Sequence, residues 1–155
     1  MKYSEYKFKF YLNANHAIYL AGNKGQNHPH TWEITLDTLK IRNDFVQFDV
    51  IEKSVEKFFS EWQDKDINTI QPFDVLNPTL ENLCLYFKDE MNRLLGEKGW
   101  LLRRIEMSET PARSYIIDLS DEPVELGTAE EQQSKPKSVD DAAEEKLEQV
   151  LESIH

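Results

Sequence analysis

The sequence predicts an α+β domain in which a four-stranded antiparallel sheet carries two helices on one face, in the order ββααββ. In the outer parts of residues 1–119, apolar side chains recur at every second position, which is typical of half-buried strands. Between these parts, two segments repeat apolar side chains every three to four positions, which is typical of amphipathic helices. The 155 residues leave room for one domain with a substantial core and not for two of ordinary size.

Two alternating segments open the domain. Residues 3–12 have one apolar face, made of Tyr6, Phe8, Phe10 and Leu12. Residues 30–41 alternate again, through Trp32, Ile34 and Leu36. A loop rich in Asn, Gly and His is expected between them, from Asn13 to Pro29, and Asn43-Asp44 predicts a turn after the second strand.

Two helices are predicted next. The first is expected to begin with a capping box formed by Asp49 and Glu52. Its apolar face consists of Ile51, Val55, Phe58, Phe59 and Trp62. The second is expected to begin at Pro78-Thr79 and to end at Gly96 and Gly99. Its apolar stripe consists of Leu80, Leu83, Cys84, Phe87, Met91, Leu94 and Leu95.

Two more strands close the domain, roughly residues 101–109 and 113–119, with Pro111 separating them into a hairpin. A sheet of four strands has two edges, and exposed edges are usually paired or covered. We therefore expect the protein to associate with itself through its sheet edges.

The tail differs from the domain in composition. Residues 120–138 are rich in Glu, Gln, Ser, Lys and Pro, which predicts an acidic disordered linker. Residues 139–155 predict a short amphipathic helix whose apolar face consists of Val139, Ala143, Leu147, Val150, Leu151 and Ile154. The favoured interpretation is a solvated or loosely docked helix, and the alternative is a helix that inserts into the groove of a protein partner.

Charge and composition exclude several classes of protein. Of the net charge of −11, the tail from residue 120 holds −8, with eleven acidic residues against three lysines, so the domain carries only −3. The absence of a basic patch argues against binding of nucleic acid, whose phosphates supply much of the affinity. No apolar run approaches the ~20 residues that span a bilayer. Cys84 is the single cysteine, which favours a reducing cytoplasm.

Three histidines are the first candidate site. His28 and His30 are two positions apart in an extended segment and therefore point the same way. An antiparallel pairing of the first two strands brings His16 close to them. Three imidazoles of this kind form the ligand set of a catalytic zinc. Each histidine taken alone is more often a surface or packed residue, so the residues by themselves favour zinc only slightly.

Glu109 is the second candidate, because it continues the apolar face of Ile105 and Met107. Burying a carboxylate without a partner costs several kcal/mol or raises its pKa. One interpretation is that the strand frays at Thr110-Pro111 and leaves Glu109 in solvent. The other is a carboxylate that grips a pair of ring N–H groups through two parallel hydrogen bonds.

Four motifs, in order, resemble the 6-pyruvoyltetrahydropterin synthase and 6-carboxytetrahydropterin synthase family. Residues 10–16, FYLNANH, resemble its first histidine motif, and residues 28–30, HPH, resemble its HGH. Residues 77–82, NPTLEN, resemble the start of its second helix, and residues 107–110, MSET, resemble its Glu-Thr strand end. The resemblance covers roughly residues 5–118.

The resemblance implies a tunnelling fold, in which subunits join their sheets into a barrel, commonly as a hexamer. It implies zinc on His16, His28 and His30, and a pterin ring anchored by Glu109 and by the backbone near Thr79. It implies 7,8-dihydroneopterin triphosphate as the substrate, with zinc acting as a Lewis acid.

The chain departs from the family in its proton-transfer groups. The family has a cysteine four residues before the HxH pair, where this chain has Lys24. The family also has an Asp-His pair before the second helix, where Asp66 matches the aspartate and Ile67 replaces the histidine. General acid–base catalysis typically accelerates a reaction by about 10²–10⁴-fold, so the loss of these groups is expected to affect the rate of turnover.

Three hypotheses follow. In the first, the protein is a divergent lyase or retro-aldol enzyme acting on a dihydropterin, with Lys24 as replacement base or cation and Asp66, the match to the family's aspartate, as the other catalytic residue. In the second, it is a catalytically inactive, zinc-containing pterin-binding or assembly module whose acidic tail contacts a partner. In the third, the barrel is structural and the histidines are incidental. The first is ranked slightly above the second, and the third well below.

Overall fold

The computed structural model describes residues 4–41 and 45–121 and confirms the predicted α+β class. Its elements are β1 (Tyr6–His16), β2 (Tyr19–Leu20), β3 (Asn23–Lys24), β4 (His28–Lys40), α1 (Phe48–Ser60), β5 (Lys65–Asp66), the 3₁₀ helix η1 (Ile67–Thr69), α2 (Leu80–Glu97), β6 (Trp100–Thr110) and β7 (Arg113–Asp118). The turn predicted at Asn43-Asp44, the helix predicted at 139–155 and all but two residues of the predicted linker lie outside the described residues.

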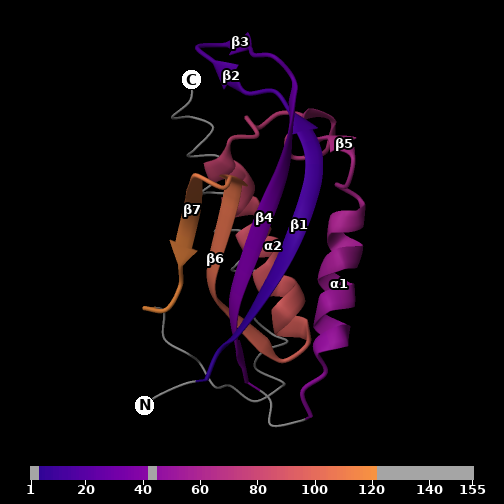
Figure 1. Cartoon of the computed structure of the whole chain (residues 1–155), viewed down its shortest axis with the longest axis vertical. Coiled ribbons are helices and arrows are strands. Elements are labelled where there is room, and N and C mark those ends of the chain that lie inside the picture. Colours follow the sequence, from indigo (N-terminus) through magenta and orange to yellow (C-terminus); the bar gives the residue numbers. More distant parts are fainter. Residues whose placement is uncertain (1–3, 42–44, 122–155) are drawn as a thin grey trace.

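One sheet forms the body of the domain, in the strand order β5-β1-β4-β6-β7. The four predicted strands are antiparallel neighbours, and β5 adds a two-residue parallel pairing at Ala14 and Asn15. Both helices lie on the same side of the sheet, and the β2-β3 hairpin extends beyond the end of β1 and β4 (Figure 1). The site-bearing ends of β1 and β4 therefore lie at one end of the sheet.

The first two strands are longer than predicted, so the histidines lie on strands and not in a loop. Alternation of exposed and buried residues continues along β1 through Asn13, Ala14, Asn15 and His16. Asparagine is depleted in strands and frequent in turns, so the sequence predicts a loop at this end of the strand. The polar side chains simply occupy the solvent-facing positions of a half-buried strand.

The side chains of both predicted helix stripes lie in the core or pack against it, but Trp62 follows the end of α1 at Ser60, and the start of α1 is not the predicted one. Its N-cap is Gln47, without a side-chain cap hydrogen bond, and Asp49 is in the first turn. The capping box of Asp49 and Glu52 is therefore wrong, because the helix begins two residues earlier than that motif requires. For α2 the prediction holds: Thr79 is the N-cap, and its side chain accepts a hydrogen bond from the Asn82 N–H.

A single apolar core fills the space between the helices and the sheet. Its largest fully buried side chains include Trp32, Phe59, Phe73 and Phe87. Cys84 is also fully buried, and burial raises the pKa of its thiol to about 12, so the thiol is inert at neutral pH. In the described part of the chain, no helix is long and apolar enough to cross a membrane.

Candidate metal centre

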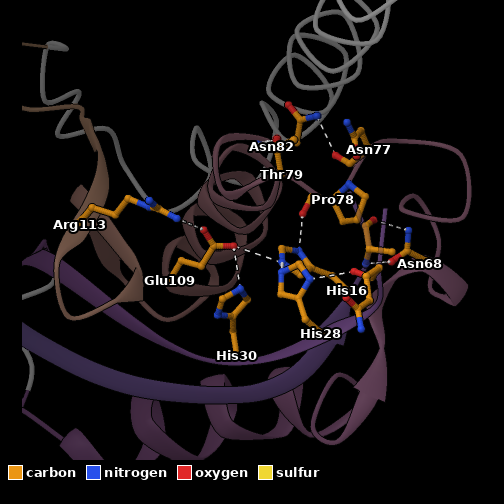
Figure 2. Close-up of polar contacts among 12 residues, drawn as sticks. His16, His28, His30, Asn68, Asn77, Pro78, Thr79, Asn82, Glu109 and Arg113 are labelled. Atoms are coloured by element: carbon orange, nitrogen blue, oxygen red, sulfur yellow. Dashed lines mark hydrogen bonds and ion pairs between the residues drawn. The ribbon is translucent and has the colours of Figure 1, made fainter. Parts of the chain in front are cut away.

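Antiparallel pairing of β1 and β4 brings the three histidines together. His16 lies directly opposite His28, and Ala14 lies opposite His30, so all three imidazoles project from the helix-covered face. Figure 2 shows the three rings converging on one point. His16 is fully buried, whereas the His30 side chain is 20% exposed, so solvent reaches the cluster from the His30 side.

Backbone carbonyls fix the tautomers of two of these histidines. Nδ1 of His16 lies 2.8 Å from the carbonyl oxygen of Pro78, and Nδ1 of His28 lies 2.9 Å from that of Gln26. A carbonyl only accepts, so each Nδ1 carries the hydrogen, and each Nε2 of the neutral ring keeps a lone pair. The two Nε2 atoms are 2.8 Å apart. Two lone pairs at this distance repel each other, and a cation between them turns that repulsion into attraction.

Burial keeps these rings in the neutral form that binds metals. Desolvation lowers the pKa of His16 below its usual value, and the nearby His28 lowers it further, although the Pro78 carbonyl and Glu109 raise it. Desolvation also lowers the pKa of His30, against an opposing effect of Glu109. Both imidazoles are therefore uncharged at neutral pH, as a metal ligand must be.

Glu109 joins the cluster from the neighbouring strand β6. It is 8% exposed, so the interpretation in which the strand frays and leaves Glu109 in solvent is wrong. Its Oε1 lies 3.2 Å from Nε2 of His16 and 3.4 Å from Nε2 of His30. Its Oε2 faces Arg113 at 3.5 Å (Figure 2). One oxygen of the carboxylate therefore faces the histidines and the other faces away.

Three side-chain amides hold the β1 segment by pairing with its backbone at two points each. Gln63 accepts from the Asn13 N–H at 2.9 Å and donates to the Tyr11 carbonyl at 2.8 Å. Asn68 makes the same pair of bonds with the N–H and carbonyl of Ala17, and Asn77 makes it with those of Tyr19. Each amide takes the place of a neighbouring strand. Together they fix the chain on both sides of His16.

The NPTLEN motif begins α2 and orients His16 at the same time. Asn77 holds Tyr19, the Pro78 carbonyl accepts from the His16 ring, and Thr79 caps the helix. Asn82 completes the unit by donating to the Asn77 carbonyl at 2.9 Å. A carbonyl that fixes the tautomer of a ligating histidine is the usual second layer of a metal site. The roles of Asn68, Asn77 and Pro78 were not predicted, because hydrogen bonds across 51, 58 and 62 residues leave no periodic pattern. The role of Asn82 was missed as well, because it depends on the position of Asn77.

The candidate proton-transfer residues lie outside this cluster. Lys24 is exposed on β3, opposite Tyr19, beyond a turn in which Ala21 and Gly22 both have positive φ. Asp66 is the N-cap of η1 and accepts from the Asn68 N–H at 3.1 Å. Ile67 is a fully buried core residue. The structure therefore groups His16, His28, His30 and Glu109, but not Lys24 or Asp66.

A hollow of about 440 Å³ lies beside the histidine-bearing ends of the strands. Its lining consists of Asn13, Ala14, Asn15, Pro29, His30, Thr31 and Asp64. His30 belongs both to the hollow and to the cluster, whereas Glu109 and Thr79 do not line the hollow. Its size falls in the range of small-molecule pockets, about 300–1,000 Å³.

The four side chains form a group that could hold a metal ion. One ligand atom from each of His16, His28, His30 and Glu109 lies within 4.8 Å of the others. In a tetrahedral zinc site with bonds of about 2.0 Å, neighbouring ligand atoms are about 3.3 Å apart. The contacts of 2.8, 3.2 and 3.4 Å are close to that spacing. Three imidazole nitrogens and one carboxylate are a ligand set that suits zinc.

Comparisons with known proteins agree with this fold. A family model described as 6-pyruvoyl tetrahydropterin synthase matches residues 5–119. The solved structure of the 6-pyruvoyl tetrahydropterin synthase of Caenorhabditis elegans is similar, with a TM-score of 0.60, 12% identity, and coverage of 76% of this chain and 96% of that one.

Two Plasmodium structures of 6-pyruvoyl tetrahydropterin synthase are similar as well. The P. falciparum protein gives a TM-score of 0.57 at 16% identity and covers 74% of this chain and 96% of that one. The P. vivax protein gives 0.58 at 15% identity, with 76% and 98% covered. At these identities the structural likeness establishes the fold alone. No curated protein matches the sequence significantly.

Proposed function

Because the chain belongs to the 6-pyruvoyl tetrahydropterin synthase family, we propose that it is a zinc-dependent protein acting on 7,8-dihydroneopterin triphosphate or a related pterin. The reaction proposed is of the lyase or retro-aldol type. The observation that carries the proposal is the contact of 2.8 Å between the Nε2 atoms of His16 and His28, both left unprotonated by carbonyls at Nδ1. Lone pairs that face each other at this distance repel, and a metal cation between the rings removes the repulsion.

Within this proposal each residue has a defined role. His16, His28 and His30 hold the metal, and bound zinc supplies Lewis-acid stabilisation of a developing negative charge. Glu109 and the backbone near Thr79 bind the pterin ring, with the Glu109 carboxylate facing paired N–H donors. Lys24 is the proposed base or cation, and Asp66 is the second proposed catalytic residue. The single buried thiol of Cys84 fits a reducing, cytoplasmic compartment.

Turnover tests the proposal directly. Zinc-loaded protein is incubated with 7,8-dihydroneopterin triphosphate, and the products are followed by mass spectrometry beside His28→Ala. We expect loss of triphosphate, or release of a hydroxymethyl-dihydropterin, in the parent protein and not in the variant. Lys24→Met should lower the rate if the lysine transfers a proton. Product formation that persists in His28→Ala would contradict a metal-dependent reaction.

A second function, pterin binding without catalysis, is favoured by the positions of the proton-transfer candidates. Asp66 is engaged in capping η1, Ile67 is buried in the core, and Lys24 is exposed on the hairpin. A zinc-containing binding or assembly module needs none of these groups. Tight binding of 7,8-dihydroneopterin triphosphate, measured by calorimetry, together with an absence of product would identify this function.

We also propose that subunits associate head to tail through their sheet edges. Between residues 11 and 15 the edge of β1 is occupied by Gln63 and β5, whereas its first half and the outer edge of β7 carry no strand partner among the described residues. Successive strands alternate in direction, so β7 of one subunit runs antiparallel to β1 of the next. Head-to-tail contacts of this kind close into rings.

Light scattering tests the association. We expect the mass of a hexamer of the 18.2 kDa subunit, and a monomer at every protein concentration would contradict it.

A further inference from the structure

We infer that Glu109 supplies the fourth metal ligand of the resting protein, so that the metal site is closed until a ligand draws the carboxylate away. The inference rests on the proposed metal site and deepens it, because it assigns Glu109 a role toward the metal and not only toward a ring. It is drawn from the position of the carboxylate relative to the three imidazoles.

The surroundings of Oε1 are the first argument. This oxygen is fully buried and has no hydrogen-bond donor among the described residues. Its neighbour at 3.2 Å is Nε2 of His16, which bears a lone pair because Nδ1 donates to Pro78. A buried carboxylate oxygen that faces the lone pair of His16 and has no hydrogen-bond partner is costly, and coordination of a cation removes that cost.

The sheet supplies the second argument. Glu109 follows Ile105 and Met107 on the helix-covered face of β6, and β6 pairs with β4, which carries His28 and His30. The carboxylate of Glu109 therefore lies on the same side of the sheet as the imidazoles. Oε2 faces Arg113 at 3.5 Å, so a single oxygen is presented to the cluster (Figure 2). One ligand atom from each of four residues is the number that a tetrahedral site requires.

The consequence is a coupling between ring binding and access to the metal. Zinc sites with four protein ligands are closed, whereas catalytic sites keep one position open. A ligand with two adjacent N–H groups competes for Glu109 through parallel hydrogen bonds. When such a ligand takes the carboxylate, it frees one position on the metal for its own oxygen atoms. The same carboxylate thus acts in turn as a metal ligand and a ring anchor.

Azide binding to the cobalt(II)-substituted protein tests the inference, since the visible absorption of cobalt(II) responds to a new ligand. The full chain is compared with Glu109→Gln, Glu109→Asp and the control Glu106→Gln, which removes a carboxylate from the same strand at a half-buried position paired with Arg104. Glu109→Asp keeps the charge but shortens the arm by one methylene. It therefore separates coordination from simple repulsion of the anion.

We expect azide to leave the spectra of the parent protein and of Glu106→Gln unchanged, and to bind both Glu109 variants at least ten-fold more tightly. Equal azide affinity in the parent protein and in both Glu109 variants would overturn the inference while leaving the metal site intact. An affinity in Glu109→Asp equal to that of the parent would also overturn it, because charge alone would then explain Glu109→Gln. Absence of stoichiometric cobalt in the parent, seen as no metal-dependent absorption, would overturn the metal site itself.

Discussion

Replacement of His28 by alanine is expected to change the free energy of unfolding in opposite directions with and without zinc. In zinc-free protein, the Nε2 atoms of His16 and His28 face each other at 2.8 Å with lone pairs on both sides. Removing one ring relieves that repulsion, and His28 is only half-buried, so little packing is lost. The zinc-free variant should therefore be as stable as the zinc-free parent or more stable.

With zinc bound, the parent protein should be the more stable of the two. Free zinc at a thousand times its dissociation constant adds about 4 kcal/mol to the stability of a folded state that binds it. The parent protein should gain this amount, and His28→Ala should gain little, because it retains two of the three imidazoles. Urea denaturation at matched free zinc concentrations, buffered by a chelator, measures both differences.

The matched control is His155→Ala, which removes the one histidine of the sequence that is not among these three. This variant should give the same urea denaturation curves as the parent protein, both with and without zinc. If His28→Ala destabilises the zinc-free protein by 2 kcal/mol or more, the ring is a packing residue and the lone-pair argument fails. If zinc stabilises the variant as much as the parent, the metal binds elsewhere.

Periodic features of the sequence predicted the framework of the fold because they report burial directly. Alternation along β1 and β4, and the apolar stripe that begins at Leu80, are both properties of neighbouring residues. The same property also identified Glu109 as unusual, since a carboxylate interrupts an apolar face. What alternation cannot supply is the order of strands in the sheet. Only the order β1-β4-β6 places Glu109 beside the histidines.

The parts that were missed depend on single contacts between distant segments. Gln63, Asn68 and Asn77 are ordinary amides in the sequence, and only after folding do they pair with the backbone of Tyr11, Ala17 and Tyr19. β5 pairs with β1 through two residues, which is too short for any pattern. The capping box of Asp49 and Glu52 failed for the opposite reason: the motif is present, but the helix begins at Phe48, whose ring contacts Tyr6 and Phe8. Tertiary contacts override local preference in such cases.

Removal of the Asn77 side chain is expected to lower both stability and metal affinity, although Asn77 touches no imidazole. Asn77 is 7% exposed, and its amide accepts from the Tyr19 N–H at 2.9 Å and donates to the Tyr19 carbonyl at 2.8 Å. Asn77→Ala leaves both backbone groups without these partners. Tyr19 is 39% exposed, so water can replace part of what these groups lose. At about 0.5–1.5 kcal/mol net for each of the two hydrogen bonds, the loss should be about 1–3 kcal/mol in urea denaturation.

Asn77→Asp tests the hydrogen bond that the Asn77 amide donates to the Tyr19 carbonyl while keeping the size of the side chain. The aspartate has nearly the same size and still accepts from the Tyr19 N–H, but its second oxygen faces the Tyr19 carbonyl where the amide had donated. We therefore expect a loss at least as large as that of Asn77→Ala. Asn15→Ala, a change at an exposed position of β1, should stay within about 0.5 kcal/mol of the parent. An Asn77→Asp variant as stable as the parent would show that the donated bond is unimportant.

The effect on the metal follows from the neighbouring carbonyl. Pro78 comes directly after Asn77, and its carbonyl fixes the ring of His16 at 2.8 Å. Loosening this turn lets the His16 ring rotate, and changes in such second-layer partners typically lower metal affinity by about 10–100-fold. Competition with a zinc chelator, carried out where Asn77→Ala is still folded, should show a loss in this range, and Asn15→Ala should show none. Unchanged zinc affinity in a destabilised Asn77→Ala would mean that the motif supports the fold of the helix start without orienting the imidazole.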